Sequence, residues 1–182
     1  MRRDPNNRGN DPIAAPTVFA ARDSGVRYEI KHWDDRFVIR TNADGAVDFK
    51  LAFAEEDDTA RANWRDWVPA KDGRLIVGML ALKDHFVRLE RVDALNRMVV
   101  VRRGDLAEHS VAFDEEAYAL SLEGGYEYDT SVLRFVYQSP TTPRRWFDYD
   151  LEARTRTLRK TQEIPSGHDP ADYITKRDRK ST

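Results

Sequence analysis

The 182 residues include no cysteine, which excludes disulfide bridges, thiol catalysis and thiolate metal sites together. No run of apolar residues approaches the ~20 that a membrane-spanning helix needs. The 30 basic and 32 acidic side chains nearly cancel, and a formal net charge of −2 provides no field that attracts a polyanion. We therefore expect no membrane span and no nucleic-acid partner, and we expect a cytoplasmic protein.

Hydrophobic residues make up 40% of the chain, which is too many for a disordered protein and enough for one domain with a real core. Residues 1–13 contain basic side chains but no apolar stretch after them, so they do not form a secretory signal. We predict a disordered lead-in at 1–13, an ordered region at 14–175 and a frayed tail at 176–182.

Helical periodicity is scarce, and short alternating or β-branched runs are typical of the sequence, which predicts an all-β fold. A turn is expected at Asn42–Gly45. Glu55–Trp67 is the only place for a short helical turn, and we interpret it as a loop that leads into a brief strand at Trp67–Val68. The other predicted strands are Tyr28–Trp33, Arg36–Thr41, Phe49–Phe53, Leu75–Leu80, His85–Leu89, Met98–Val101, Leu133–Tyr137, Trp146–Tyr149 and Thr155–Leu158.

These runs recur at a fixed distance. Phe37, Phe86 and Phe135 are each 49 residues apart, and Leu51, Val100 and Tyr149 repeat the same step. A period of roughly 40–50 residues with about four short strands per unit is typical of β-propeller blades. We place three four-stranded antiparallel blades at about 26–68, 74–113 and 118–158, and interpret Pro16–Phe19 as the last strand of a preceding blade.

Three blades do not close a ring, because propellers use typically four to eight. The spacings therefore also allow a sandwich or another three-sheet arrangement in which the equal steps are accidental. In an incomplete ring, the outer blades each lack a neighbour that would cover one apolar face.

The third repeat carries the most specific residues. They include an acidic residue before Asp129-Thr130, then Leu133-Arg134-Phe135, and then Ser139-Pro140-Thr141-Thr142-Pro143, all within Tyr126–Pro143. Further pieces are Phe147–Leu151, Leu158–Pro165, Gly167–Tyr173, Asp35–Asn42 and Phe49–Leu51. Together these motifs resemble the prolyl oligopeptidase family of serine peptidases, in its oligopeptidase B branch, over roughly Ala14 to Arg177.

This resemblance implies a seven-bladed propeller that caps an α/β-hydrolase domain and keeps folded proteins away from the nucleophile. It also implies a cytosolic enzyme that cleaves short peptides after Arg or Lys. The chain matches only the last part of that propeller, and the connector after the third blade points toward a hydrolase domain that the match does not include. We expect a truncated product, a remnant or one half of a split gene.

Catalytic machinery is not recognisable in the sequence. None of the serines lies in the Gly-x-Ser-x-Gly pattern of a nucleophile elbow, and the turn at Ser166-Gly167 is better explained as a connection. The four histidines (His32, His85, His109 and His168) lack metal-binding spacing. We expect His32 and His85 at strand ends, exposed or half-buried, and His168 in a packing role. We name no catalytic, cofactor or metal site residue.

Three charged or glycine-rich stretches have ordinary explanations. The acidic runs Glu55–Asp58 and Asp114–Glu116 lack the spaced ligands of a calcium loop and are expected to be solvated loops. Arg144-Arg145-Trp146 is expected on a local sheet surface rather than in a nucleic-acid groove. Gly124-Gly125 does not open a helix and is therefore not a phosphate cradle.

The first hypothesis is thus a catalytically inactive piece of a peptidase cap. The second is a split enzyme in which a hydrolase domain and the missing blades are supplied in trans, because unpaired strand edges are templates for pairing. The third is a free-standing binding module that self-associates through its open blades, with two copies forming a six-bladed ring.

Overall fold

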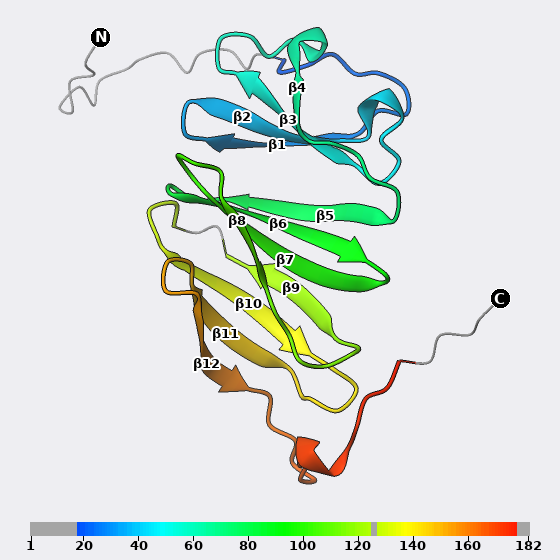
Figure 1. Ribbon diagram of the computed structural model, residues 1–182, viewed down its shortest axis with the longest axis vertical. Helices are drawn as coiled ribbons and strands as arrows, with labels where there is room; N and C mark the ends of the chain where they lie inside the picture. Colours follow the sequence, from blue (N-terminus) through cyan, green and yellow to red (C-terminus); the bar gives the residue numbers. More distant parts are fainter. Residues whose placement is uncertain (1–17, 125–126, 178–182) are drawn as a thin grey trace.

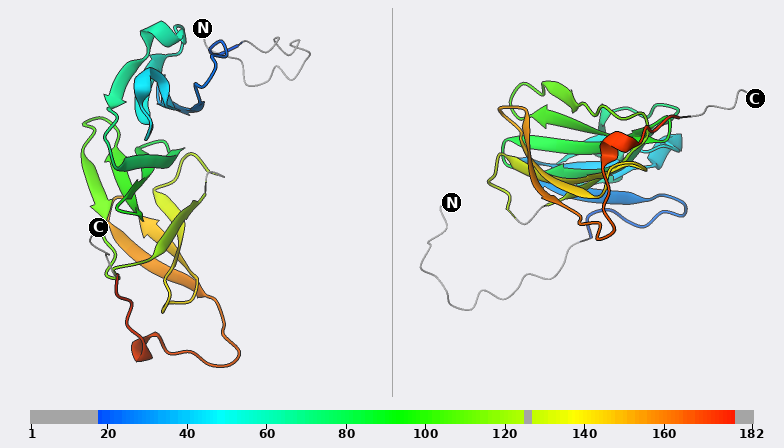
Figure 2. Two further views of the ribbon diagram at one scale, coloured as in Figure 1. Left: turned by 90° about the vertical axis from the view of Figure 1, so that its right-hand side faces the viewer. Right: turned by 90° about the horizontal axis from the view of Figure 1, so that it is seen from below.

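The computed structural model describes residues 18–124 and 127–177, and in these ranges the chain forms twelve β-strands and three short 3₁₀ helices. The strands make three four-stranded antiparallel sheets, each with its strands hydrogen-bonded in chain order. The sheets are stacked along the long axis of the molecule (Figures 1 and 2). The all-β prediction is confirmed. The predicted lead-in at 1–13 and residues 178–182 of the tail lie outside the described residues.

The sheets correspond closely to the predicted blades. The first contains β1 (Tyr28–Trp33), β2 (Arg36–Thr41), β3 (Lys50–Glu55) and β4 (Arg65–Val68). The second contains β5 (Arg74–Ala81), β6 (His85–Val92), β7 (Leu95–Arg102) and β8 (Glu108–Val111). The third contains β9 (Ala119–Glu123), β10 (Val132–Gln138), β11 (Arg145–Asp150) and β12 (Thr155–Thr161). The sequence analysis named no strand at β8 or β9.

The 3₁₀ helices are η1 (Ala43–Gly45), η2 (Arg61–Asn63) and η3 (Pro170–Asp172). Only η2 lies within Glu55–Trp67, so the expectation that a helical turn could form nowhere else is wrong. At η1 the predicted turn residues are used differently: Asp44 and Gly45 both have positive φ, which lets the backbone reverse tightly. Among the described residues, no helix is long and apolar enough to cross a membrane.

The 49-residue step reflects strand order. The three phenylalanines lie in the second strand of their sheets (β2, β6 and β10), and Leu51, Val100 and Tyr149 lie in the third. The pairing register is not repeated, since Phe86 opposes Val101 whereas Phe135 opposes Phe147. The reason is that the hairpins between second and third strands differ in length: they span 42–49, 93–94 and 139–144. The 49-residue step therefore reflects which strand of the repeat a residue lies in, and not which residue it opposes on the next strand.

The second sheet is buried on both faces. Successive side chains of a strand point to opposite faces, so Phe86 packs toward the first sheet while Val87 and Leu89 pack toward the third. The same alternation places Val101 on one face of β7, and Met98 and Val100 on the other. This explains why β7 reads as a continuous apolar run rather than as an alternating one.

We call the contact between the first and second sheets the first interface. Trp33, Trp67 and Phe86 meet there, and the Trp33 and Trp67 rings stack with centroids 5.7 Å apart. The indole Nε1 of Trp33 donates a buried hydrogen bond of 2.8 Å to the carbonyl of Leu82 in the next sheet. Arg40 crosses the same interface and donates to the carbonyl of Ile76 at 3.0 Å.

The first interface also contains buried charge. Arg88 lies on the same face of β6 as Phe86, and its exposed fraction is 5%. Its Nε lies 2.7 Å from Glu90, which is also buried, and its two Nη atoms lie 2.7 Å from the carboxylate of Glu108. The guanidinium thus has a charged partner on each side, which offsets the cost of removing it from water.

We call the contact between the second and third sheets the second interface. Its core is aliphatic and aromatic: Phe135 and Phe147 stack with centroids 5.3 Å apart against Val87, Met98 and Leu133. Polar groups lie mainly near one end, where His109 Nε2 is 3.0 Å from the Tyr149 hydroxyl. The two interfaces therefore bury comparable side chains but differ in how much charge they contain.

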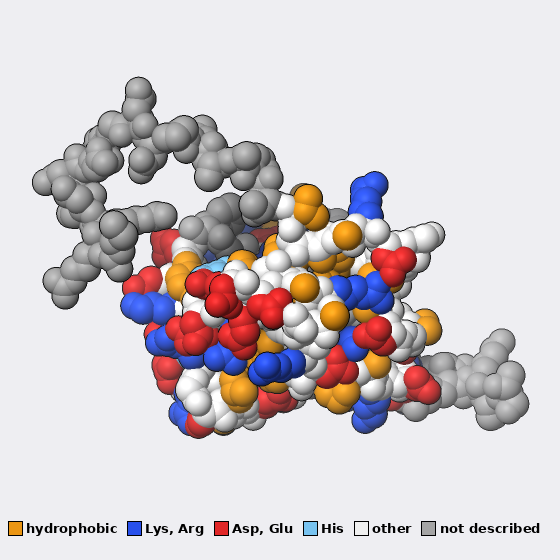
Figure 3. Space-filling model, turned by 90° about the horizontal axis from the view of Figure 1, so that it is seen from above, with side chains coloured by type: hydrophobic (Ala, Val, Ile, Leu, Met, Phe, Trp, Pro, Cys, Tyr) orange, Lys and Arg blue, Asp and Glu red, His pale blue; other side chains and the backbone are white. Residues whose placement is uncertain are grey.

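The outward face of the first sheet is partly covered by its own chain. Phe19 packs edge-on against Phe37, with ring centroids 5.0 Å apart, and Trp64 lies beside Phe19 and Tyr28. Val18 and Phe19 are not in a strand, so the predicted strand at Pro16–Phe19 is wrong for these two residues, and its first two residues are not described. Figure 3 shows hydrophobic side chains interspersed with charged ones at this end of the molecule.

Candidate functional site

The serines and histidines do not assemble into a catalytic group. In residues 18–124 and 127–177, no serine hydroxyl makes a hydrogen bond with a histidine ring. The Ser139 hydroxyl is held in its own loop, where it accepts from the backbone NH of Thr142 at 2.8 Å. No group of three or more His, Asp or Glu side chains in the described part of the chain is placed to hold a metal ion.

The histidines have three different surroundings. His32 is exposed and pairs with Glu56, in line with the prediction. His168 stacks on Tyr173 with centroids 5.1 Å apart, which fits the predicted packing role. His85 was expected to be exposed or half-buried, and that is wrong: its exposed fraction is 2%, and its Nε2 lies 3.3 Å from Glu152 in the third sheet.

The best candidate for a functional surface is formed by the first strands of the three sheets. Residues of β1, β5 and β9 line one hollow of about 400 Å³. Its walls include Lys31 and His32 from β1, Leu80 from β5 and Leu122 from β9. In a propeller the blades surround a central channel, and a surface shared by corresponding strands of successive sheets matches the wall of such a channel.

Ion pairs join the sheets at the end that carries the hairpins between first and second strands. Arg103 lies 2.7 Å from Asp34 of the first sheet and 2.9 Å from Asp84 of the second. Lys83 reaches Asp129 of the third sheet at 2.7 Å, and the hydrogen bond with Asp129 raises the pKa of this lysine. These exposed contacts align the three sheets rather than supply much stability.

The connector after the third sheet runs along the opposite end of the molecule. His168 Nε2 lies 2.7 Å from the carbonyl of Thr141, and the Thr175 hydroxyl lies 3.1 Å from that of Thr141. Further on, the Arg177 backbone NH donates to Glu116 at 3.2 Å, and its side chain contacts the carbonyl of Asp93 in the second sheet. The chain therefore leaves the blades beside the hairpins at 93–94 and 139–144 (Figure 1).

The charged stretches mostly follow the sequence analysis. Glu55–Asp58 is exposed, and Gly124 follows β9 in a loop whose next residue, Gly125, is not described. Arg145 and Trp146 lie in β11, as expected for a sheet surface, whereas Arg144 lies just before the strand with its guanidinium over the Trp146 ring. The prediction that Asp114–Glu116 is wholly solvated is wrong, because Glu115 is half-buried and accepts a 2.5 Å hydrogen bond from the Thr142 hydroxyl.

Comparison with known proteins agrees with this architecture. A family model described as "Prolyl oligopeptidase, N-terminal beta-propeller domain" matches residues 3–162. The chain belongs to this family. The match begins before Ala14, where the resemblance was expected to start, and ends near the close of β12 rather than at Arg177. The three sheets are accordingly blades of a prolyl oligopeptidase propeller.

Individual relatives support the same assignment. The chain is 37% identical over 169 residues to dipeptidyl aminopeptidase BI of Pseudoxanthomonas mexicana, covering 91% of this chain and 23% of that protein. Oligopeptidase B from Leishmania major and oligopeptidase B from Trypanosoma brucei with covalently bound antipain each have a TM-score of 0.78, at 25% and 26% identity. Each alignment covers 86% of this chain and 23% of the solved chain. The chain therefore spans about a quarter of the length of these relatives.

One strand that lines the hollow was not predicted from the sequence. Leu122 contributes to it from β9, a strand that was not predicted. The alternation Ala119-Leu120-Ser121-Leu122 was an available signal, with Leu120 buried and Ser121 exposed. This alternation was not recognised as a strand because acidic and glycine residues lie next to it.

Proposed function

We propose that these blades are part of the cap of a serine peptidase of the oligopeptidase B type, which cleaves short peptides after Arg or Lys in the cytoplasm. The cap limits access to a nucleophile that lies on a separate hydrolase domain. Membership of the prolyl oligopeptidase propeller family supports the role, and the oligopeptidase B structures at a TM-score of 0.78 support the branch. The chain by itself is expected to hydrolyse nothing.

The observation that carries the proposal is the hollow lined by β1, β5 and β9. A hollow shared by three first strands is the part of a propeller wall past which a small substrate could move and a folded protein could not. The connector supports a position for the hydrolase domain, because the connector leaves the blades along the end that carries the hairpins at 93–94 and 139–144. That end is the surface on which we place the hydrolase domain.

A chimera tests this role. The matching segment of dipeptidyl aminopeptidase BI is replaced by residues 18–177 of this chain, and hydrolysis of a short reporter peptide and of unfolded casein is compared. We expect the chimera to cleave the peptide and to spare casein, and the parent enzyme, assayed in parallel, is the reference. A folded chimera that degrades both substrates, or hydrolysis by this chain alone that a serine-directed phosphonate abolishes, would contradict the proposal.

A second candidate is the release of dipeptides, which the 37% identity to dipeptidyl aminopeptidase BI favours. The two activities differ in whether the substrate needs a free N-terminus. The chain would be produced with the hydrolase domain encoded beside or beyond it, and assayed on one Arg-containing peptide with a free or an acetylated N-terminus. Cleavage of both forms supports the oligopeptidase activity, and cleavage of the free form alone supports dipeptide release.

A further inference from the structure

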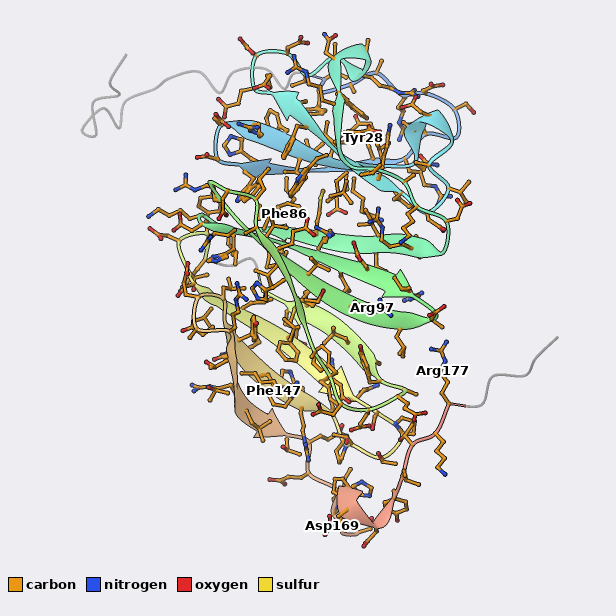
Figure 4. The ribbon with its side chains drawn as sticks, in the orientation of Figure 1. Tyr28, Phe86, Arg97, Phe147, Asp169 and Arg177 are labelled. Atoms are coloured by element: carbon orange, nitrogen blue, oxygen red, sulfur yellow. The ribbon has the colours of Figure 1, made fainter. Side chains whose placement is uncertain are left out.

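A second cavity lies away from the hollow surface, at the outer strands of the second interface. Its volume is about 300 Å³, which is within the range of small-ligand pockets. One side is the loop between β8 and β9, at Phe113–Glu115, and the other side comes from β10, β11 and β12 of the third sheet. Phe147, labelled in Figure 4, marks its position in the third sheet.

Aromatic rings form the apolar wall of this cavity. Phe113 stacks on Tyr137 with centroids 5.2 Å apart and an interplanar angle of 12°. Phe147 contributes a third ring from the neighbouring strand β11. The Arg156 guanidinium lies 5.4 Å above the Phe113 ring and 3.5 Å from Asp114, so this arginine already has partners. The rings provide a flat apolar surface for one side chain of a ligand.

Arg145 is the unusual residue of the cavity. It opposes Tyr137 across β10 and β11, so the two side chains share the cavity face of the sheet. Arg145 as a whole is half-buried, and its Nε atom is buried without a hydrogen-bond partner. In the described part of the chain, the guanidinium makes neither a hydrogen bond nor an ion pair with another residue. A partly buried cation with no counter-charge in direct contact is destabilising, and an anionic group that reaches it would relieve that cost.

Glu115 provides the opposite charge. One carboxylate oxygen accepts from Thr142, while the other is buried without a partner. Burial opposes its ionisation, but hydroxyl groups of Ser139 and Thr142 outweigh that effect and hold the pKa of Glu115 below its ordinary value. The side chain is therefore a carboxylate near neutral pH, and it has a fixed position with one oxygen still able to accept.

We propose that this cavity binds one free α-amino acid that has an aromatic or branched apolar side chain. Its carboxylate pairs with Arg145, its ammonium group pairs with Glu115, and its side chain packs against Phe113 and Phe147. The assignment uses both unpartnered groups at once, and it balances a cavity whose four charged residues, two acidic and two basic, sum to zero. The proposal does not depend on the peptidase role.

Other ligand classes fit less well. A phosphate or another pure anion would face Asp114 and Glu115, and an organic cation would face Arg145 and Arg156. An internal peptide segment has neither terminal charge, so it would leave both buried groups unpaired. A free amino acid carries both charges on one carbon atom, which suits a cavity of this size.

Calorimetric titration of the 182-residue chain with L-phenylalanine, L-leucine and L-tyrosine tests the proposal. We expect at least one of them to bind. The amide of that amino acid lacks the carboxylate, and its deaminated acid lacks the ammonium group, so each should bind about tenfold or more weakly. This comparison uses the unmodified chain and does not depend on how any variant folds.

Variants then identify the residues. Arg145→Gln and Glu115→Gln should each weaken binding about tenfold or more. Arg144→Gln and Glu116→Gln are the matched controls, since Arg144 lies over Trp146 and Glu116 contacts the Arg177 backbone instead of the cavity. These controls should bind as the original chain does. Absence of binding by all three amino acids at millimolar concentration, equal affinity for the amide, or full affinity in folded Arg145→Gln would each overturn the proposal.

Discussion

The first and second interfaces join the same kind of sheet by different chemistry. At the first, the Arg88 and Glu90 side chains are buried on the strand that carries Phe86, and Arg88 also pairs with the exposed carboxylate of Glu108. At the second, stacked phenylalanines and aliphatic side chains fill the space, and the polar contacts lie near its margins. The contrast teaches that a repeat can fix the order of strands while leaving the contact between blades free to vary. Apolar packing tolerates changes that preserve volume, whereas a buried ion pair tolerates no loss of one partner.

The largest effect is expected from the repeated phenylalanines. Phe86→Ala and Phe135→Ala each remove a fully buried ring from one interface and should lower the free energy of unfolding by about 3–5 kcal/mol. Phe37→Ala should cost less than about 2 kcal/mol, because its ring is only half-buried. Urea denaturation measures all three. Equal losses at positions 37, 86 and 135 would show that the repeat, and not burial, determines the energetics.

Arg88→Met tests the charge that distinguishes the first interface. The change removes the nearer of the two cations beside buried Glu90 and leaves only Arg74, whose Nε is 3.9 Å away, so we expect a loss of about 3–5 kcal/mol in the free energy of unfolding. The double variant Arg88→Met/Glu90→Leu removes both charges and should recover part of that loss. If the single variant is as stable as the original chain, the buried charges have no energetic role and the comparison fails.

A smaller effect is expected from the hydrogen bond between the first two sheets. Trp33→Phe removes the Nε1 donor and leaves the Leu82 carbonyl buried without it, which should cost about 1–3 kcal/mol. Trp67→Phe is the matched control, because the Trp67 indole makes no hydrogen bond with another described residue. Comparable unfolding free energies for the two variants would mean that ring volume, rather than the bond, accounts for the loss.

The smallest effect concerns the second interface and pH. Burial, together with Arg154 and His85, lowers the pKa of His109 in the folded protein. The unfolded chain takes up the proton near the ordinary value of about 6.5, so stability present above that pH is lost as the pH falls through the lower folded pKa. His109→Gln should flatten the decline in urea midpoint between about pH 7.5 and about pH 5.5. Exposed His168→Gln is the control and should leave the slope unchanged; an unchanged slope in His109→Gln would remove this role.

The fold could be predicted where residues alternate clearly, as in Tyr28–Trp33, or where both faces are buried, as in Met98–Val101. The strand β8 was missed because its segment, Glu-His-Ser-Val, is short and polar and lies at the edge of its sheet, where hydrogen bonding rather than side-chain pattern defines it. Edge strands in general carry a weaker hydrophobic signal than central ones.

The second cavity could not be predicted, because its charges come from segments far apart in the chain. The acidic run gave no sign that Glu115 alone would bond to Thr142, which is 27 residues away. Of the pair Arg144-Arg145, only Arg145 lies in the sheet, as the first residue of β11. The sequence could not distinguish it, facing the cavity, from Arg144, which lies just before the strand and over Trp146. Such sites depend on which strands become neighbours, and that is decided by the whole stack.

The position of β12 has a mechanical consequence. All seven of its residues are exposed, and it pairs only with β11, at the outer edge of the third sheet. A pull on the chain beyond Thr161 would break the hydrogen bonds between β12 and β11 one after another rather than all at once. The strands β11, β10 and β9 would then follow in turn, since the meander leaves each of them at the new edge. A molecular motor that grips this side would meet low resistance at exposed β12 and its first substantial obstacle at β10, where Leu133 and Phe135 are buried against the second sheet.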